Sequence, residues 1–211
     1  MSTGTAAPRR PYHGKRLLDL VLLAVMALPA LIAGAVGALA LWLDDGSPVL
    51  FRQERSGLRG RPFVLLKLRT MRRGAMAFGA NEGEVTVVGA VLRRLSIDEI
   101  PQLANVLRGD MSMVGPRPTL PYQVERYTQR QRLRLSVLPG LTGLAQVHGR
   151  QRMAWPQRIE WDLRYVENQS LRLDLAVLLL TIWTVLTGAG STANHDNDPI
   201  ARLEKRPENL V

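Results

Sequence analysis

Two adjacent carboxylates, Asp98 and Glu99, follow a pair of arginines and precede an apolar segment with helical spacing. A helix that starts at Asp98 places Pro101 within its first turn, where the missing proline N–H costs little. Asp98 then lies at the positive end of the helix dipole, which keeps a carboxylate ionised and attracts phosphate. Such an aspartate is a candidate nucleophile toward phosphorus, and Glu99 is a candidate ligand of a divalent cation.

The same stretch also has a structural interpretation. Ser96-x-x-Glu99 before an apolar run matches a capping box, which is a common pattern. With Ser96 as the cap, however, Pro101 would be the fifth helical residue and would remove an intrahelical hydrogen bond. The position of the proline therefore favours a helix that begins at Asp98.

Cations that could neutralise a phosphate lie on a predicted strand and between two prolines. Strand periodicity puts Lys67 and Arg69 on one face, about 7 Å apart along the strand. They form either an anion clamp or a pair of solvated edge charges that oppose aggregation. Arg117 stands between Pro116 and Pro118, whose rings restrict the backbone on both sides of it.

A hairpin and several helices must position these residues. The pattern of apolar residues predicts strands at 49–52 and 63–69 after a turn at 44–48. It predicts helices at 91–95, 99–107, 121–138, 158–167 and 171–186. Four arginines of the third helix make a basic face, either solvated or in contact with anionic lipid: Arg126, Arg130, Arg132 and Arg134. We expect a polar, glycine-rich loop at 73–84 and a polar tail from residue 188.

Charge and composition limit the classes of partner. The chain has 211 residues and a net charge of +10, which favours an acidic partner: nucleic acid, anionic lipid or a phosphorylated substrate. Three Phe, four Tyr and four Trp are few for a base-stacking surface, so we expect no nucleic-acid partner. The chain has no cysteine and three dispersed histidines, which argues against disulfides and against a Cys-based or His-rich metal site.

An apolar segment near the N-terminus predicts contact with a membrane. Residues 20–43 carry no charge and would form a helix of roughly 36 Å, enough to cross a bilayer core and too long for a cleaved signal peptide. The segment either spans the bilayer or forms a re-entrant hairpin that breaks at Pro29. Four Lys or Arg residues precede it and four follow it closely, so both ends are expected on the cytoplasmic side, which favours the re-entrant form.

The order of these pieces, together with several other motifs, resembles the bacterial sugar transferases, the small monotopic polyprenol-phosphate phosphoglycosyl transferases. The matching motifs run from about residue 15 to 187 and comprise Lys15-Arg16-Leu17-Leu18-Asp19, Phe51-x-Gln53-x-Arg55-x-Gly57, Lys67-Leu68-Arg69-Thr70-Met71, Ser96-Ile97-Asp98-Glu99-Ile100-Pro101-Gln102-Leu103, Val114-Gly115-Pro116-Arg117-Pro118, Pro139-Gly140-Leu141-Thr142-Gly143, Gln146-Val147 with Gly149-Arg150, and Asp162-x-x-Tyr165-Val166-Glu167-Asn168. This chain departs from the family pattern at Leu28-Pro29, Val87, Ala90 and His148.

The resemblance implies an α+β, mainly helical, monotopic membrane fold. It would have a basic segment and re-entrant helix-break-helix hairpin at residues 1–43, and a cytoplasmic catalytic domain with a small β-hairpin and interfacial amphipathic helices at 44–187. A polar tail would occupy 188–211. The catalytic domain would face the cytoplasm at the bacterial inner membrane and contact its phospholipids, as a monomer or a homodimer.

The resemblance also implies an activity: transfer of a sugar 1-phosphate from a nucleotide sugar, usually a UDP-sugar, to a polyprenol phosphate such as undecaprenyl phosphate, as in exopolysaccharide biosynthesis. By motif, Asp98 is the nucleophile and Glu99 the Mg²⁺ ligand. Lys67, Arg69 and Arg117 would bind phosphate, and Gln146 and Arg150 the nucleotide. Asp162 and Asp174 match acidic positions of the family, in supporting or structural roles.

Two other functions fit part of the sequence. A membrane-bound Mg²⁺-dependent phosphohydrolase would use the same nucleophile but water as the acceptor. A non-enzymatic binder of anionic lipid or nucleic acid would account for the positive charge alone, and its affinity would fall steeply with salt.

Overall fold

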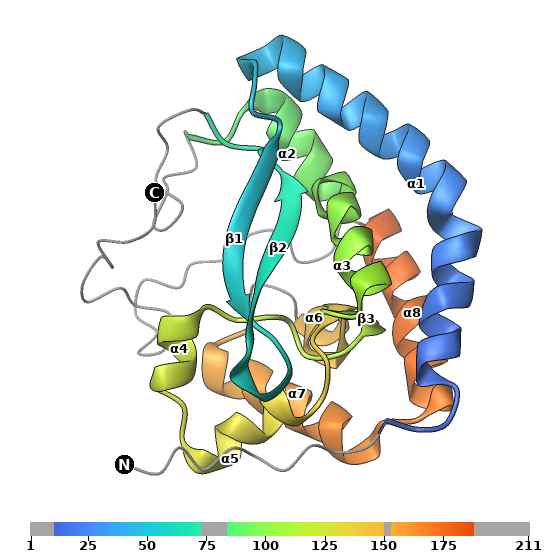
Figure 1. Ribbon diagram of the computed structural model, residues 1–211, viewed down its shortest axis with the longest axis vertical. Coiled ribbons are helices and arrows are strands. Elements are labelled where there is room, and N and C mark those ends of the chain that lie inside the picture. Colours follow the sequence, from blue (N-terminus) through green and yellow to red (C-terminus); the bar gives the residue numbers. More distant parts are fainter. Residues whose placement is uncertain (1–10, 73–83, 150–152, 188–211) are drawn as a thin grey trace.

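The computed structural model describes residues 11–72, 84–149 and 153–187. Its α+β fold is mainly helical, as predicted, and is built around a hairpin of two strands (Figure 1). The main elements in chain order are α1 (Lys15–Asp45), β1 (Leu50–Ser56), β2 (Pro62–Leu68), α2 (Val87–Arg94), the 3₁₀ helix η3 (Ile97–Gln102), α3 (Leu103–Arg108), β3 (Ser112–Val114), α4 (Pro121–Glu125), α5 (Gln129–Arg132), the 3₁₀ helix η4 (Leu133–Ser136), β4 (Gly140–Thr142), α6 (Leu144–Gly149), α7 (Trp155–Asn168) and α8 (Leu171–Thr187).

The predicted hairpin is confirmed: β1 and β2 pair antiparallel, with Phe51 opposite Lys67. The side chain of Asn105 in α3 closes the free edge of β2, because it donates to the carbonyl of Val64 (2.8 Å) and accepts from the N–H of Leu66 (3.2 Å). Asn105 is fully buried, and its amide replaces the ladder partner that an edge strand otherwise lacks. The strand that carries Lys67 is thereby joined to the helix that follows Asp98.

The N-terminal helix α1 is continuous through Pro29, so the predicted interruption of the helix at this proline is wrong. The helix bends instead (Figure 1), and Pro29 lies near its middle. A proline inside a helix removes one hydrogen bond and tilts the preceding turn, which commonly produces a bend without ending the helix. Whether α1 enters and leaves a membrane on one side stays a prediction.

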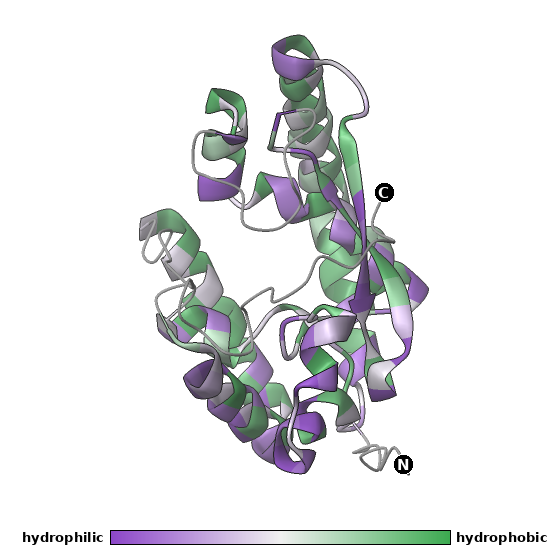
Figure 2. Cartoon of the chain, turned by 90° about the vertical axis from the view of Figure 1, so that its left-hand side faces the viewer, coloured by the Kyte–Doolittle hydropathy of each residue, from purple (hydrophilic) through white to green (hydrophobic). Residues whose placement is uncertain are grey.

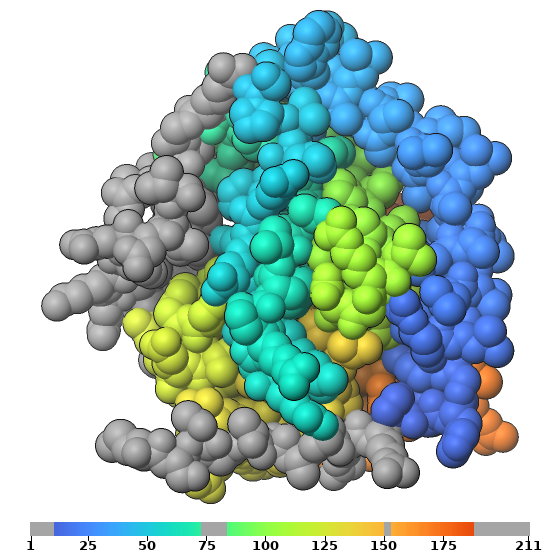
Figure 3. Space-filling model, in the orientation of Figure 1, coloured from blue at the N-terminus to red at the C-terminus, as the bar shows by residue number. Residues whose placement is uncertain are grey.

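Both ends of α1 are attached to the rest of the fold. At its start, Lys15 binds Asp174 of α8, and Asp19 accepts from the hydroxyl of Ser112 (2.9 Å). At its end, Asp45 binds Arg69, which follows β2. Figure 3 shows the helix lying along one side of the molecule. Because both ends contact the same folded unit, α1 lies against that unit.

The outward face of α1 is apolar. In the described part of the chain α1 alone has the length and composition to cross a membrane, at about 46 Å for a continuous helix. Its hydrophilic C-terminal end is at the top of Figure 2. Large apolar side chains are exposed on both α1 and α8: Leu17, Leu20, Val21, Val25, Met26, Leu28, Leu31, Ile32, Val36, Leu39, Trp42 and Leu43 on α1, and Leu171, Leu175, Leu179, Leu180, Ile182, Trp183 and Leu186 on α8.

In the described part of the chain the core consists of three buried clusters. The largest joins the hairpin, α3, β3, α7 and α8 through residues such as Leu65, Val106 and Val177. A second cluster packs Leu41 of α1 against Leu68 and Leu92. A third cluster packs Tyr127 against Ile159 and Leu163 of α7. The parallel pairing of β3 with β4, which brings the residues after Val114 close to those after Pro139, is not signalled by the sequence pattern.

The single helix predicted over residues 121–138 is wrong, because the structure divides it into α4, α5 and η4. A new helix is capped at Thr128. The Thr128 hydroxyl accepts a hydrogen bond from the N–H of Gln131, and the Gln131 side chain accepts one from the N–H of Thr128 (2.9 Å). This capping box begins a new helix. The predicted four-arginine face is lost with it, because Arg134 is buried.

Candidate active site

Asp98 lies in the first turn of η3 and is 8% exposed. The residue before this turn, Ser96, has a left-handed backbone (φ +57°) and its side chain makes no capping hydrogen bond, so the capping box is wrong. The predicted start at Asp98 is also displaced, because a 3₁₀ helix begins at Ile97 and α3 only at Leu103. Left-handed conformations are unfavourable for residues other than glycine and occur disproportionately at functional sites.

Asp98 is surrounded by charge. Burial, reinforced by the neighbouring Glu99 carboxylate, raises the pKa of Asp98 from 3.8 to about 6. The positive charges of Lys67, Arg117 and Arg93 act in the opposite direction, because an opposite charge nearby favours the ionised form. With a pKa near 6, most Asp98 side chains are carboxylates at neutral pH, which is the nucleophilic form.

The cations outnumber the acids in this cluster. Burial, together with the nearby charge of Arg55, lowers the pKa of Lys67 to about 8. The pKa of Arg55 falls to about 10 through burial and the charge of Arg117. Within residues 11–72, 84–149 and 153–187, neither Lys67 nor Arg55 forms an ion pair with a carboxylate. Lys67 instead lies 5.0 Å from the centre of the Phe51 ring. Positive charge in excess is what a bound diphosphate requires.

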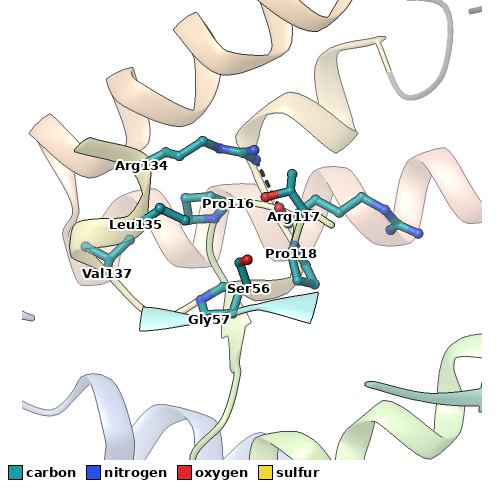
Figure 4. Close-up of a pocket in the computed structure, with 10 residues that line it drawn as sticks. Ser56, Gly57, Pro116, Arg117, Pro118, Arg134, Leu135 and Val137 are labelled. Carbon is teal, nitrogen blue, oxygen red and sulfur yellow. Dashed lines mark hydrogen bonds between the residues drawn. The ribbon is translucent and has the colours of Figure 1, made fainter. Parts of the chain in front are cut away.

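Arg117 reaches the same cluster from the loop after β3. Its Nη2 donates to Oε1 of Glu99 at 2.8 Å, and its side chain is 49% exposed. In Figure 4 the guanidinium of Arg117 points away from a small pocket behind the loop, whose lining includes Ser56, Arg134 and Val137. Arg117 is therefore available to a ligand while being oriented by Glu99.

Arg69 does not join Lys67 in an anion clamp. It binds Asp45 and donates to the carbonyls of Pro48, Gly46 (2.9 Å) and Met71 (3.1 Å). These contacts occupy the guanidinium and fix the turn between α1 and β1. Arg69 lies one residue beyond the end of β2. Of the two residues, it is Lys67 whose charge acts on that of Asp98.

Asp162 and Asp174, which were predicted to have supporting or structural roles, each form a buried ion pair. Asp162 pairs with Arg134, and both side chains are 2% exposed. Asp174 pairs with Lys15 and accepts from the hydroxyls of Tyr165 and Tyr12, both at 2.8 Å. The first pair joins α7 to η4, and the second joins α8 to α1.

Of the two residues predicted to bind nucleotide, Gln146 lies within the described residues. Gln146 in α6 donates to the carbonyl of Leu141 at 3.0 Å, and its Oε1 is buried without a hydrogen-bond partner. Arg150 lies outside the described residues. His148, a departure from the family pattern, stacks on Trp161 with ring centres 4.1 Å apart.

The cation predicted at Glu99 has a limited set of protein ligands. In the described ranges no group of three or more His, Cys, Asp or Glu side chains could enclose a metal. Mg²⁺ commonly binds through one or two carboxylates together with substrate phosphates and water. The pair Asp98 and Glu99 fits that mode, so these residues suit a magnesium ion that arrives with a phosphorylated substrate.

Sequence reasoning missed two residues of the cluster, Arg55 and Arg93. A signal for Arg55 was present, because alternation along β1 puts Phe51, Gln53 and Arg55 on one face and the register places Phe51 opposite Lys67. Arg93, at the end of α2, also acts on the charge of Asp98 and donates to the hydroxyl of Thr70 at 2.7 Å. Whether Arg93 approaches Asp98 depends on how α2 packs against the rest of the fold, which no local sequence pattern indicates.

Comparison with known proteins identifies the family of this chain. The bacterial sugar transferase family matches residues 11–188. The uncharacterized sugar transferase EpsL of Bacillus subtilis is 44% identical over 189 residues, covering 86% of this chain and 92% of that protein. The UDP-glucose:undecaprenyl-phosphate glucose-1-phosphate transferase of Caulobacter vibrioides is 45% identical over 189 residues (82% of this chain, 70% of that protein). The exopolysaccharide production protein ExoY of Sinorhizobium fredii is 38% identical over 205 residues (86% and 90%). With every described residue inside the match, the chain belongs to the bacterial sugar transferase family.

Proposed function

We propose that this protein transfers a sugar 1-phosphate from a UDP-sugar to a polyprenol phosphate through a covalent intermediate on Asp98. The observation that carries the proposal is a buried carboxylate, ionised at neutral pH, among cations that exceed the acids in number. The names of relatives from Caulobacter vibrioides and Escherichia coli specify the same type of reaction, with UDP-glucose and undecaprenyl phosphate as substrates.

In the first step an oxygen of Asp98 attacks the phosphorus that bears the sugar. The bond from this phosphorus to the bridging oxygen breaks, and the electron pair leaves with the nucleoside monophosphate. In the second step an oxygen of the polyprenol phosphate attacks the same phosphorus, and the carboxylate of Asp98 is released unchanged. Two displacements allow one pocket to serve a soluble donor first and a lipid acceptor afterwards.

The residues around Asp98 lower the repulsion between the attacking carboxylate and the diphosphate. Lys67 and Arg117 both supply positive charge near Asp98, and Arg55 lies near Lys67 and Arg117. Fixed charges of this kind stabilise the negative charge of the transition state without reorganisation. When Mg²⁺ is bound, Glu99 and Asp98 would hold it, and it would neutralise phosphate oxygens.

We also propose that the apolar faces of α1 and α8 rest in the cytoplasmic leaflet of the inner membrane, where they contact phospholipid and admit the acceptor. Attachment of both ends of α1 to one folded unit supports a re-entrant arrangement, because a spanning helix would separate its ends by the bilayer. We assign the catalytic domain to the cytoplasmic side because its proposed donor, a nucleotide sugar, requires that side. The chain has no native cysteine, so single cysteines can be introduced as His13→Cys and Arg61→Cys. A thiol reagent should label both from the same side of the membrane, and labelling from opposite sides would overturn the arrangement.

The covalent step is tested by incubating the purified protein with Mg²⁺ and donor alone. A panel of UDP-sugars should include UDP-glucose and UDP-N-acetylgalactosamine, which the names of relatives contain. Mass spectrometry should find one phosphosugar on the peptide that contains Asp98, with release of UMP. Asp98→Asn should give no adduct, whereas Glu160→Gln, which alters an exposed acid paired with Arg130, should give the same adduct as the unmodified protein.

Adding polyprenol phosphate separates transfer from hydrolysis. A transferase should pass the phosphosugar to the lipid and regenerate unmodified protein, whereas a hydrolase would release free sugar phosphate whether or not lipid is present. UMP release at full rate from Asp98→Asn, or an adduct on another residue, would exclude Asp98 as the nucleophile.

A further inference from the structure

The backbone of the loop that carries Arg117 is held mainly through its carbonyl groups. Pro116 and Pro118 have no N–H to donate, so donors from elsewhere in the fold must fix this segment. Three of its carbonyls accept such bonds: Pro116 from the N–H of Gly140 (2.9 Å), Arg117 from Arg134 (3.0 Å) and Pro118 from Arg55 (3.2 Å). Just before the loop, the carbonyl of Val114 at the end of β3 accepts from Lys15 (2.9 Å) and Tyr165 (3.0 Å).

The bond from Arg134 is placed directly on the residue that contacts the site. Nη2 of Arg134 donates to the carbonyl of Arg117, drawn as a dashed line in Figure 4, while the Arg117 guanidinium extends away toward Glu99. Backbone and side chain of Arg117 are thus held at two separate points. A rotation of its backbone would move the guanidinium away from Glu99 and from any phosphate beside it.

Arg134 is itself rigidly supported. It is 3% exposed, and the same Nη2 also binds Asp162, while its Nη1 donates to the hydroxyl of Tyr127. Its guanidinium also lies 5.8 Å from the centre of the Trp155 ring. Burying an ion pair of this kind contributes little net stability, because desolvation offsets most of the attraction. The planar fork of arginine can serve several acceptors at fixed angles, which lysine cannot do.

We infer that Arg134 is a positioning residue for the reaction: braced by Asp162, it fixes the backbone of Arg117 so that the Arg117 guanidinium meets the substrate phosphate beside Glu99. This inference rests on the proposed transferase activity and adds a residue remote from the reacting atoms. Arg134 does not touch the substrate, and its whole contribution to the rate passes through Arg117.

A double-mutant cycle on the full-length protein tests this dependence. Arg134→Lys keeps the charge but not the fork, and Asp162→Glu keeps the pair but shifts the carboxylate; each is made with and without Arg117→Ala. With Arg117 present, each should lower kcat about 10- to 100-fold, with a smaller change in the KM for the UDP-sugar. In the Arg117→Ala background the same changes should alter kcat less than about threefold, because the group they position is gone.

Rates are expressed per folded molecule, with thermal unfolding recorded for every variant. Arg130→Lys, which alters an exposed arginine of the neighbouring α5, is the control and should leave both kcat and KM unchanged. An equal loss of kcat in both backgrounds would show a general structural role and overturn the inference. A wild-type protein that releases no UMP from any UDP-sugar would instead contradict the proposed function, so the two failures are distinguishable.

Discussion

The guanidinium of Arg117 lies 2.8 Å from the carboxylate of Glu99, although the two residues are 18 positions apart in the chain. This contact joins the loop after β3 to the turn that carries Asp98. It also balances one positive charge against the acid predicted to bind Mg²⁺. Two other cations of the cluster, Lys67 and Arg55, form no ion pair with a carboxylate among the described residues, so the cluster carries positive charge in excess.

Replacing Arg117 should separate activity from stability. The pair with Glu99 is partly open to solvent, at 49% and 23% exposure, and such pairs contribute at most about 1 kcal/mol to folding. Arg117→Ala should therefore leave thermal unfolding nearly unchanged while lowering kcat/KM about 10²- to 10³-fold, the usual cost of a lost transition-state donor. The kcat/KM of Arg117→Lys should lie between those of the wild type and Arg117→Ala. A large fall in melting temperature would instead assign Arg117 a structural role.

The raised pKa of Asp98 predicts that this carboxylate destabilises the folded protein above pH 6. Its pKa is 3.8 when unperturbed and about 6 in the fold, so the folded state binds the proton more tightly and stability falls as pH rises from about 4 to 6. A shift of about two units corresponds to about 3 kcal/mol. Asp98→Asn should therefore be more stable than wild type at pH 7.5, by up to that amount, and similar at pH 4.

This stability difference is measured by thermal unfolding in EDTA, so that no bound cation alters the titration. Asp110→Asn is the matched control, because Asp110 accepts a hydrogen bond from Asn105 at 3.2 Å and lies outside the cation cluster. It should not show the same gain at pH 7.5. Equal stability of wild type and Asp98→Asn at pH 7.5 would contradict the raised pKa of Asp98 and the burial that causes it.

Breaking the ion pair between Lys15 and Asp174 should destabilise the protein strongly. Both side chains are buried, at 6% and 0% exposure, and removing one partner leaves an uncompensated buried charge at a cost of about 3–5 kcal/mol. Asp174→Asn should accordingly lower the melting temperature, and Lys15→Met combined with Asp174→Leu should recover part of the loss. Glu160→Gln, at an exposed pair, should have no effect; if it destabilised as much as Asp174→Asn, burial would not be the cause.

Gly37 of α1 should tolerate no larger side chain. A Cβ there would lie 3.1 Å from Ile97 and 3.3 Å from both Leu68 and Leu92, so Gly37→Val should cost about 1–3 kcal/mol by overpacking. Helix propensity alone predicts the opposite sign, because valine favours helices more than glycine does. Ala35→Val, on the exposed side of the same helix, should change the melting temperature little. Stabilisation by Gly37→Val would show that α1 does not pack against η3.

Local patterns were sufficient for the existence of the hairpin and of α7, and for both ends of α8 to within one residue, because strand alternation and helical spacing depend on neighbouring residues. They failed over residues 121–138, where apolar periodicity continued although the capping pair Thr128 and Gln131 starts a new helix. They also failed at Pro29, because packing of Gly37 and Leu41 against the hairpin side of the fold supports the helix beyond the proline.

From the sequence by itself come the candidate nucleophile Asp98, its acidic neighbour, the rigid setting of Arg117 and the apolar N-terminal helix, since each depends on residue types only a few positions apart. Only the tertiary structure decides which of the many arginines serve the site. It brings Arg55 toward Glu99 and Arg93 toward Asp98. It also pairs Arg69 with Asp45 at the end of α1 and buries Arg134 against the backbone of Arg117. The physical reason is that a long cationic side chain binds the acceptor that the packing of distant segments brings near it. The periodicity of residues along the chain does not indicate which distant segments will pack together.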